Sequence, residues 1–134
     1  MALIQVPAET PTGFALVNPL HVVALASPDH RPDLTLIVLM LGARAGKDAS
    51  RPNEVWCKAP VDVLLKTFGP FVRVRRQQPT GNPWTDYHLR LASIATAYEL
   101  RDGRAYVYMI DGYEYLIEDG SVLRGAGIEI TVLE

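Results

Sequence analysis

Two segments of this sequence share one order of elements: an apolar strand, a second strand that ends in glycine, a third strand, and a short apolar stretch closed by glycine. The best-matched pieces are residues 35–42 (TLIVLMLG) and 105–112 (AYVYMIDG), which lie 70 positions apart. The strands before them, around Val22 and Ala95, align at an offset of about 73. We therefore expect a single compact domain over residues 1–134 with an internal duplication, 14–69 and 71–134.

The first segment contains the clearest helix signal of the chain. Residues 34–41 are almost wholly aliphatic, which is typical of a strand covered on both faces. Residues 54–59 resume as a strand, and Pro60 then stands at the first turn of a helical spacing that ends at Gly69. The apolar positions of that spacing are Val61, Leu64, Leu65 and Phe68. The pattern predicts one short helix at about 60–68.

The second segment is richer in turn signals. Two Asp-Gly pairs, at 102–103 and 111–112, are flanked by apolar alternation and predict two-residue hairpin turns. They divide the segment into a three-strand meander over 94–101, 104–110 and 113–118. The stretch 121–125 is too short for a helix prediction. Residues 128–133 are predicted to form a closing strand. The fold class expected is α+β, mainly antiparallel β, with two similar small β-rich halves; the alternative is an all-β sandwich or barrel.

Composition excludes several classes of protein. The chain is 49% hydrophobic and 21% charged with a net charge of −2, which argues against disorder and gives no overall attraction to nucleic acid or an anionic membrane. No apolar run approaches the ~20 residues that span a bilayer, so no membrane partner is expected. The N-terminus lacks a basic region, and the single cysteine, Cys57, fits a reducing compartment. We expect a cytoplasmic protein.

No catalytic constellation is visible. The glycine-rich stretch 42–47 has three residues between its glycines where a phosphate-binding loop needs four, and Asp48 replaces the Ser or Thr that would hold magnesium. His21, His30 and His88 are scattered without metal-ligand spacing. Cys57 lies in an apolar strand, where a buried thiol is not a nucleophile. We predict a non-enzymatic protein with no metal and no cofactor.

An arginine-rich hairpin is the first candidate binding site. Residues 71–76 (FVRVRR) and 87–91 (YHLRL) both alternate, so that their polar side chains share one face, with an aromatic residue at the tip of the loop between them. Arginine forks match bidentate anions and an aromatic ring can stack on a base. The alternative is a solvated face balanced by the acidic residues of 99–119. The candidates for an anion or partner site are Arg73, Arg75, Arg76, Trp84, His88 and Arg90.

A tyrosine face is the second candidate. With a two-residue turn at 111–112, Ile110 lies opposite Tyr113, and one face of the meander then carries four tyrosines. These are Tyr106, Tyr108, Tyr113 and Tyr115. Such a face is either core or an interface, and because the opposite face is also apolar, both sides require a cover. One cover would be the rest of the chain, and the second would be another copy in a homodimer or a protein partner.

Three sequence strings resemble a family of very small proteins. They are 17–23 (VNPLHVV), 36–39 (LIVL) before Gly42, and 60–65 (PVDVLL). This pattern is similar to the FlbD-type family and to short proteins of phages and prophages of GC-rich bacteria, and it covers residues 14–69. The chain departs from it in the long loop at 42–53. The resemblance carries no site residues, but it implies a mobile-element protein that acts in the host cytoplasm by binding.

Three functional hypotheses follow. The first is a binding protein, phage or prophage encoded, that inhibits or modulates a host protein complex by stoichiometric interaction. The second is a nucleotide- or nucleic-acid-binding protein that uses the arginine hairpin. The third is a virion or assembly component that self-associates.

Overall fold

The computed structural model of the 134-residue chain describes residues 2–28, 30–43, 53–78, 84–125, 128 and 131. Most of the secondary structure is β-strand. The strands are β1 (Ile4–Pro7), β2 (Phe14–Val17), β3 (Val22–Ala26), β4 (Thr35–Leu39), β5 (Glu54–Cys57), β6 (Phe71–Gln77), β7 (Trp84–Arg90), β8 (Ile94–Glu99), β9 (Ala105–Met109) and β10 (Glu114–Ile117). The helices are α1 (Val61–Thr67), α2 (Val122–Gly125) and two 3-10 turns, η1 (Pro19–His21) and η2 (Leu91–Ser93).

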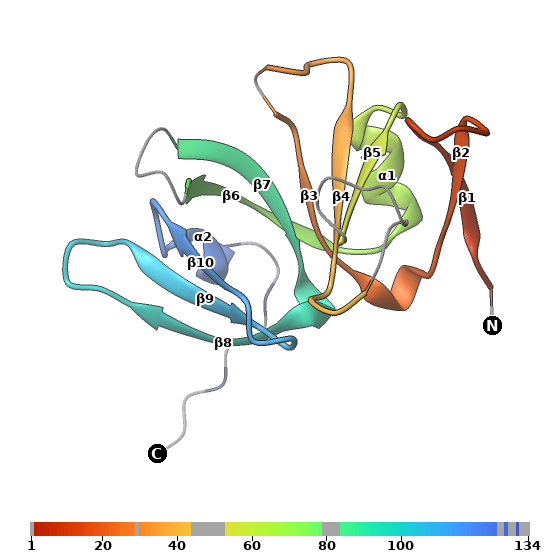
Figure 1. Cartoon of the computed structure of the whole chain (residues 1–134). Coiled ribbons are helices and arrows are strands. Elements are labelled where there is room, and N and C mark those ends of the chain that lie inside the picture. The colour runs from red at the N-terminus through yellow and green to blue at the C-terminus, as the bar shows by residue number, and fades with distance from the viewer. Residues whose placement is uncertain are drawn as a thin grey trace.

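Eight strands form one sheet in the order β5-β4-β3-β7-β6-β10-β9-β8, and β1 and β2 form a separate hairpin. Every strand pair is antiparallel, which confirms the prediction of a mainly antiparallel β fold. The large sheet is strongly bent, so that β3–β5 and β8–β10 stand at an angle to each other with β6 and β7 between them (Figure 1). We call the side of the sheet inside this bend the inner face and the opposite side the outer face.

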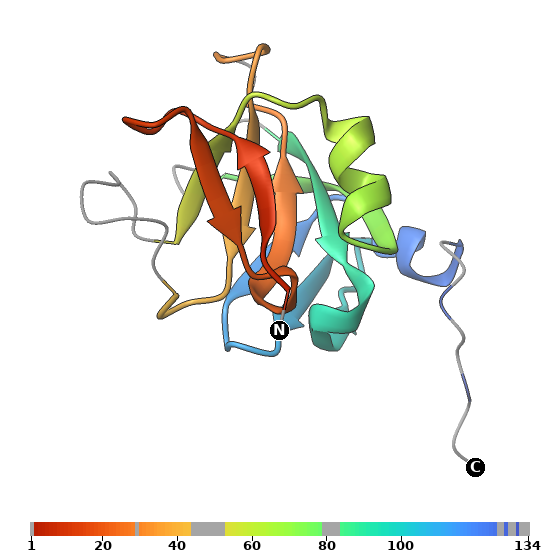
Figure 2. The same cartoon turned by 90° about the vertical axis from the view of Figure 1, so that its right-hand side faces the viewer.

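Two hydrophobic clusters lie on opposite sides of the sheet. The inner cluster includes Leu36, Val74, Val107 and Ile117, from both arms of the bend. The outer cluster lies over β3–β5, where the β1–β2 hairpin and α1 cover the sheet (Figure 2). Neighbouring residues of β4 belong to different clusters, because side chains alternate along a strand. The structure therefore agrees with the expectation that this aliphatic strand is covered on both faces.

Helix α1 follows the signals that predicted it. Pro60 is its N-cap residue, and a glycine with a φ of 95°, Gly69, follows its C-cap. Its buried residue Leu64 and the adjacent Phe68 join the outer cluster, as does Cys57, which is fully buried. Burial raises the pKa of the Cys57 thiol, so the group stays protonated and unreactive.

Two runs of elements have the same order and the same strand register. We call η1-β3-β4-β5-α1 the N-unit and η2-β8-β9-β10-α2 the C-unit. In the N-unit, the cross-strand rows are Leu25–Ile37–Val55 and Ala26–Leu36–Trp56. In the C-unit, the corresponding rows are Ala97–Val107–Tyr115 and Tyr98–Tyr106–Leu116. Both hairpins also have a register shift near the start of their first strand. The two units therefore repeat one arrangement of elements, and the duplication stays a prediction.

The two Asp-Gly turns differ from their prediction. Met109 donates its backbone N–H to Tyr113 and Leu100 donates to Arg104, so that each loop has three residues. Gly103 and Gly112 have φ values of 92° and 88°, which fits a type I turn followed by a left-handed residue. The extra residue shifts the pairing of β9 with β10 by one position. Most of the predicted phosphate-loop-like stretch and of the predicted strand 128–133 lies outside the described residues.

Candidate functional site

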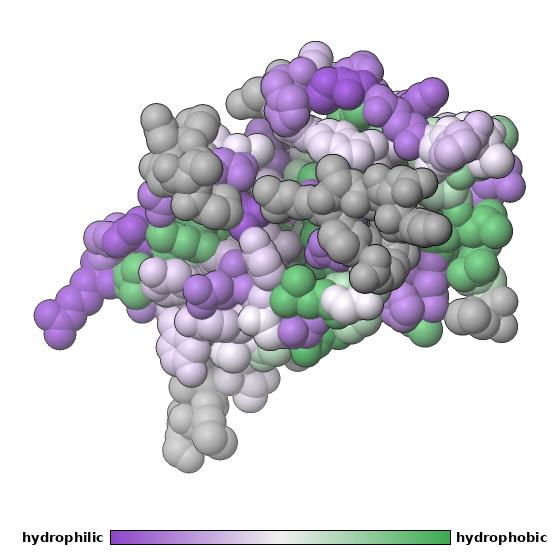
Figure 3. Space-filling view, viewed as in Figure 1, coloured by the Kyte–Doolittle hydropathy of each residue, from purple (hydrophilic) through white to green (hydrophobic). Residues whose placement is uncertain are grey.

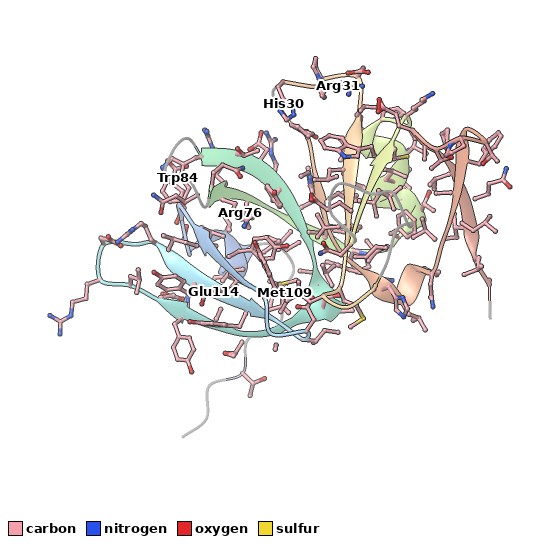
Figure 4. The ribbon with its side chains drawn as sticks, in the orientation of Figure 1. His30, Arg31, Arg76, Trp84, Met109 and Glu114 are labelled. Carbon is pink, nitrogen blue, oxygen red and sulfur yellow. The ribbon has the colours of Figure 1, made fainter. Side chains whose placement is uncertain are left out.

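The arginine hairpin is strand pair β6–β7, and its outer face carries most of the predicted site. Arg73 lies opposite His88 and Arg75 lies opposite Asp86, so that these side chains share the outer face with Trp84 and Arg90. Trp84 is the first residue of β7 (Figure 4). The sequence alternation therefore placed five of the six residues on one side of the sheet.

The arginines of this face already have partners. Arg73 lies 2.9 Å from the carboxylate of Asp86, and Arg75 lies 3.7 Å from that of Glu118. Arg90 donates hydrogen bonds to the backbone carbonyls of Pro19 and Val22, which tie η1 to β7. Surface ion pairs of this kind contribute little to stability, and they also neutralise much of the charge that an anion would meet. The face is balanced rather than strongly basic.

His88 is the half-buried member of this face. Its Nδ1 atom is buried and has no hydrogen-bond partner among the described residues. Burial, and then the positive charge of Arg73, lower the pKa of His88. The imidazole is therefore held neutral near pH 7, where it adds no positive charge to the face.

Arg76 does not lie with the other arginines, which corrects its predicted placement. It is the third buried residue of β6, after Val72 and Val74, and only 8% of it is exposed. The side chain points to the inner face of the sheet (Figure 4). The sequence reads Arg-Arg at 75–76, and strand alternation alone sends the second arginine inward, which is the signal that could have found it.

The predicted tyrosine face is split between the two faces of the sheet, because of the three-residue turn. Glu114 pairs with Tyr108, and Tyr115 pairs with Val107, one position away from the expected register. Tyr115 therefore joins the inner cluster and is 2% exposed, with Tyr113 packed against the same cluster. Burial raises the pKa of Tyr115, which stays a neutral phenol. Tyr106 and Tyr108 lie on the outer face.

A different tyrosine group results, and it includes a residue that sequence reasoning did not select. Tyr98 lies opposite Tyr106, and its ring centroid is 5.8 Å from that of Tyr108 in an edge-to-face arrangement. Tyr98 is 62% exposed. Finding it requires the β8–β9 register, which the residue types alone do not fix. We call this group the tyrosine surface, and its members are Tyr98, Tyr106, Tyr108, Thr96, Leu116 and Glu114.

The tyrosine surface borders an open strand edge. Among the described residues, β8 pairs only with β9, and five of its six residues are exposed. None of them is Lys, Arg or Pro, which are residues that commonly block strand edges. The other end of the sheet is different, because β5 is covered by an Ala8–Cys57 bridge and by a hydrogen bond from the Glu9 N–H to the Trp56 carbonyl.

Charge distinguishes this end of the molecule as well. Residues 99–119 contain six acidic residues and two arginines, a formal charge of −4. Glu114 belongs to the tyrosine surface itself. Desolvation of the Tyr108 hydroxyl, and then its hydrogen bond with Glu114, raise the pKa of Tyr108. Two of the six acids pair with arginines outside this range, Glu99 with Arg124 and Glu118 with Arg75, so the open edge lies in a setting that stays acidic by two charges.

The described residues contain neither a cluster of metal ligands nor a membrane-spanning helix. No group of three or more His, Cys, Asp or Glu side chains in those ranges is arranged to hold a metal ion. No helix in the same part of the chain has the length and apolar character needed to cross a bilayer.

Comparisons with known proteins show a fold likeness. No protein-family model matches the sequence, and no curated protein matches it. Among solved structures, the chain is similar to a LytTr DNA-binding domain, from a protein of Bacillus cereus described as a methyl-accepting/DNA response regulator. The TM-score is 0.53 at 13% sequence identity, and the match covers 87% of this chain and 86% of the other. At this identity the likeness establishes the fold alone.

Proposed function

We propose that the chain is a non-enzymatic binding protein that docks an extended, basic segment of a protein partner along β8 and over the tyrosine surface. The observation that carries the proposal is the open β8 edge beside partly exposed tyrosines in an acidic setting. The resemblance to phage and prophage proteins extends the proposal, with the partner in a host complex that the chain inhibits or modulates.

The strand edge provides the first part of the recognition. In an antiparallel ladder, hydrogen-bonded and non-hydrogen-bonded pairs alternate. Because the N–H of Leu100 bonds to Arg104, the amides of Tyr98 and Thr96 are directed to β9, and those of Ala97 and Glu99 are directed away from it. An extended peptide that pairs with these outward groups would add a ninth strand to the sheet.

The tyrosines and the acidic residues provide the second part. Tyrosine rings are frequent anchors of protein interfaces because they bury a large area with few rotatable bonds. A partner with lysine or arginine side chains would complement the acidic residues of 99–119, two of which, Glu99 and Glu118, already pair with Arg124 and Arg75. A second copy would bring the same acidic residues to the same edge, and like charges disfavour that pairing. Nucleic acid is disfavoured at this end for the same reason.

The test is binding of the labelled chain to an immobilised library of random eight-residue peptides. We expect enrichment of peptides that alternate Lys or Arg with β-branched or aromatic residues. Ala97→Pro removes one outward N–H and should abolish the enrichment, whereas Ala97→Ser keeps that N–H and should not. Tyr98→Ser should weaken binding, since it removes the most exposed ring.

A matched control lies at the far end of the molecule. The β1–β2 hairpin exposes Leu3, Phe14 and Leu16, and an apolar region lies over this hairpin in Figure 3. Phe14→Ser with Leu16→Ser should leave peptide binding unchanged. Loss of binding in this variant, or equal binding by Ala97→Pro and Ala97→Ser, would move the interface away from β8.

Nucleic-acid binding is the second candidate, because the protein with a similar fold is described as a DNA-binding domain. The residues that would serve are Arg73 and Arg75, which are 70% and 56% exposed in their side chains, with Trp84 at the same face. The test is fluorescence anisotropy of a labelled DNA duplex and a single strand over a range of salt concentrations. Phosphate contacts predict affinity that falls steeply with salt and is lost in Arg73→Glu with Arg75→Glu. DNA binding that changes neither with salt nor in the double arginine variant would exclude this face as the nucleic-acid site.

A further inference from the structure

Arg76 is a buried cation on the inner face of the sheet. It donates hydrogen bonds from Nη1 to the hydroxyl of Tyr87 at 2.9 Å and from Nη2 to the hydroxyl of Tyr113 at 2.7 Å. Its guanidinium carbon also lies 4.6 Å from the ring centroid of Tyr115. Neutral hydroxyls and ring faces offset only part of the cost of burying a charge.

No carboxylate forms an ion pair with Arg76 within the described ranges. The ion pairs found there use Arg31, Arg73, Arg75, Arg104 and Arg124, and none includes Arg76. A guanidinium has five N–H donors, and the two hydroxyls accept two of them. With respect to the described residues, donor capacity that matches a bidentate anion therefore remains at a buried position.

A cavity of about 720 Å³ lies beside Arg76, between the two arms of the bent sheet. Its size falls in the range of about 300–1,000 Å³ that is usual for small-molecule sites. Aromatic and aliphatic side chains form much of its wall. They include Trp56, Tyr87, Tyr113, Tyr115, Leu36 and Val38.

The wall chemistry selects among anions. Aromatic side chains from both arms favour a flat, apolar body that can stack or meet their edges. Two acidic residues also line the cavity, Glu54 and Asp111, and the Asp111 carboxylate accepts the backbone N–H groups of Leu41 and Tyr113. Two acids beside one arginine disfavour a doubly charged phosphate and favour a ligand with a single negative charge.

We propose that this cavity binds a small aromatic carboxylate, with the carboxylate on Arg76 and the ring system between Trp56, Tyr87 and Tyr115. The site uses the inner face of the sheet, whereas the proposed peptide surface uses the outer face and the β8 edge. The two proposals can therefore fail separately.

The test is calorimetric titration of the full chain with 2-naphthoate, a bicyclic aromatic carboxylate. 2-Naphthylmethanol serves as the neutral analogue and inorganic phosphate as the anion without a ring. We expect saturable binding of naphthoate and at least about tenfold weaker binding of each of the other two. The two tryptophans give an independent readout, because only Trp56 lines the cavity. Its indole N–H signal should shift on titration, and that of Trp84, assigned with Trp84→Phe, should not.

Variants separate the charge of Arg76 from its packing. Arg76→Met keeps an apolar stem and should weaken naphthoate binding at least about tenfold. Arg73→Met makes the same change on the outer face and should leave binding unchanged. If Arg76→Met does not fold, Arg76→Lys replaces it, because lysine keeps the charge without the paired N–H donors of the guanidinium group. Arg76→Lys should bind naphthoate more weakly than the unaltered chain does. It should still bind naphthoate more tightly than naphthylmethanol.

Three results would overturn the proposal. The first is an absence of saturable naphthoate binding at millimolar concentration. The second is binding that Arg73→Met and Arg76→Met affect equally, or that shifts Trp84 instead of Trp56. The third is equally tight binding of one of the two control ligands. Phosphate binding as tightly as naphthoate would mean that the ring is not recognised, and naphthylmethanol binding as tightly would mean that the charge is not recognised.

Discussion

The N-unit and the C-unit have the same element order and register, but their equivalent faces meet different surroundings. The row Ala26–Leu36–Trp56 of the N-unit faces the inner side of the bend, where Ala26 and Leu36 are buried. The equivalent row of the C-unit, Tyr98–Tyr106–Leu116, is on the outer face. The C-unit has no counterpart of the β1–β2 hairpin among the described residues, and its outer row stays partly exposed. One strand pattern can thus provide core in one place and an exposed surface in another.

The largest expected effects come from a position that is fully buried in both units. Ile37 and Val107 are equivalent positions, and both are fully buried. Ile37→Ala and Val107→Ala should each lower the free energy of unfolding by about 2–4 kcal/mol, because each leaves a cavity. Chemical denaturation measures the loss, with the exposed Val63→Ala as the control that should change little. A near-zero loss at Val107 would mean that the C-unit is not packed as described.

The row that differs between the units gives the next largest contrast. Leu36→Ala should cost about 2–4 kcal/mol, since Leu36 is 6% exposed, while the equivalent Tyr106→Ala should cost about 1 kcal/mol or less. The same denaturation experiment measures both. Equal losses at the two positions would contradict the proposal that the tyrosine surface is open.

A smaller effect should be equal in the two units. Gly42 and Gly112 lie 70 positions apart, each after the second strand of its unit, and have φ values of 89° and 88°. An added Cβ would meet no atom within 4 Å at either site, so the cost of alanine is only that of the left-handed backbone. Gly42→Ala and Gly112→Ala should each lower the free energy of unfolding by about 1 kcal/mol. A large difference between them would show that the left-handed backbone is not the main cost at one of the two positions.

The smallest predicted effect concerns pH and the strands that join the units. Burial and then Arg73 lower the pKa of His88 in the folded chain, so the unfolded chain takes up the proton first as the pH falls. The contribution of His88 is therefore fully present above its unfolded pKa and is lost as the pH falls through the lowered folded value. Between about pH 7 and 5, the free energy of unfolding should decrease less in His88→Gln than in the unaltered chain. Identical pH profiles would remove this contribution.

Particular residues show how far the sequence could predict this fold. The pattern from Pro60 to Gly69 places α1 correctly, and the aliphatic 34–41 run is a strand buried on both sides, because local spacing determines both features. The Asp-Gly signals locate both hairpins, but they do not distinguish a two-residue from a three-residue loop. That single residue decides which tyrosines are core, since a shift of one position exchanges the faces of a strand.

Three features of the candidate sites depend on tertiary structure and could not be predicted from the sequence: the ion-pair partners of the arginines, the cavity and the open strand edge. Alternation placed Arg73 and Arg75 together, but only the folded sheet shows that Asp86 and Glu118 neutralise them. The cavity beside Arg76 is formed by residues from both arms of the bend, which are distant in sequence. The open edge of β8 depends on the strand order, which places β5 at the covered end.

The most direct test of the proposed surface is backbone amide hydrogen exchange of Ala97 and Glu99, measured by NMR. In the free chain, both amides should exchange rapidly at every protein concentration, because they are directed away from β9. Addition of the most enriched basic peptide should slow both, while the amides of Thr96 and Tyr98 are protected throughout. Protection of Ala97 and Glu99 in the free chain, or rapid exchange in the presence of a bound peptide, would contradict the account.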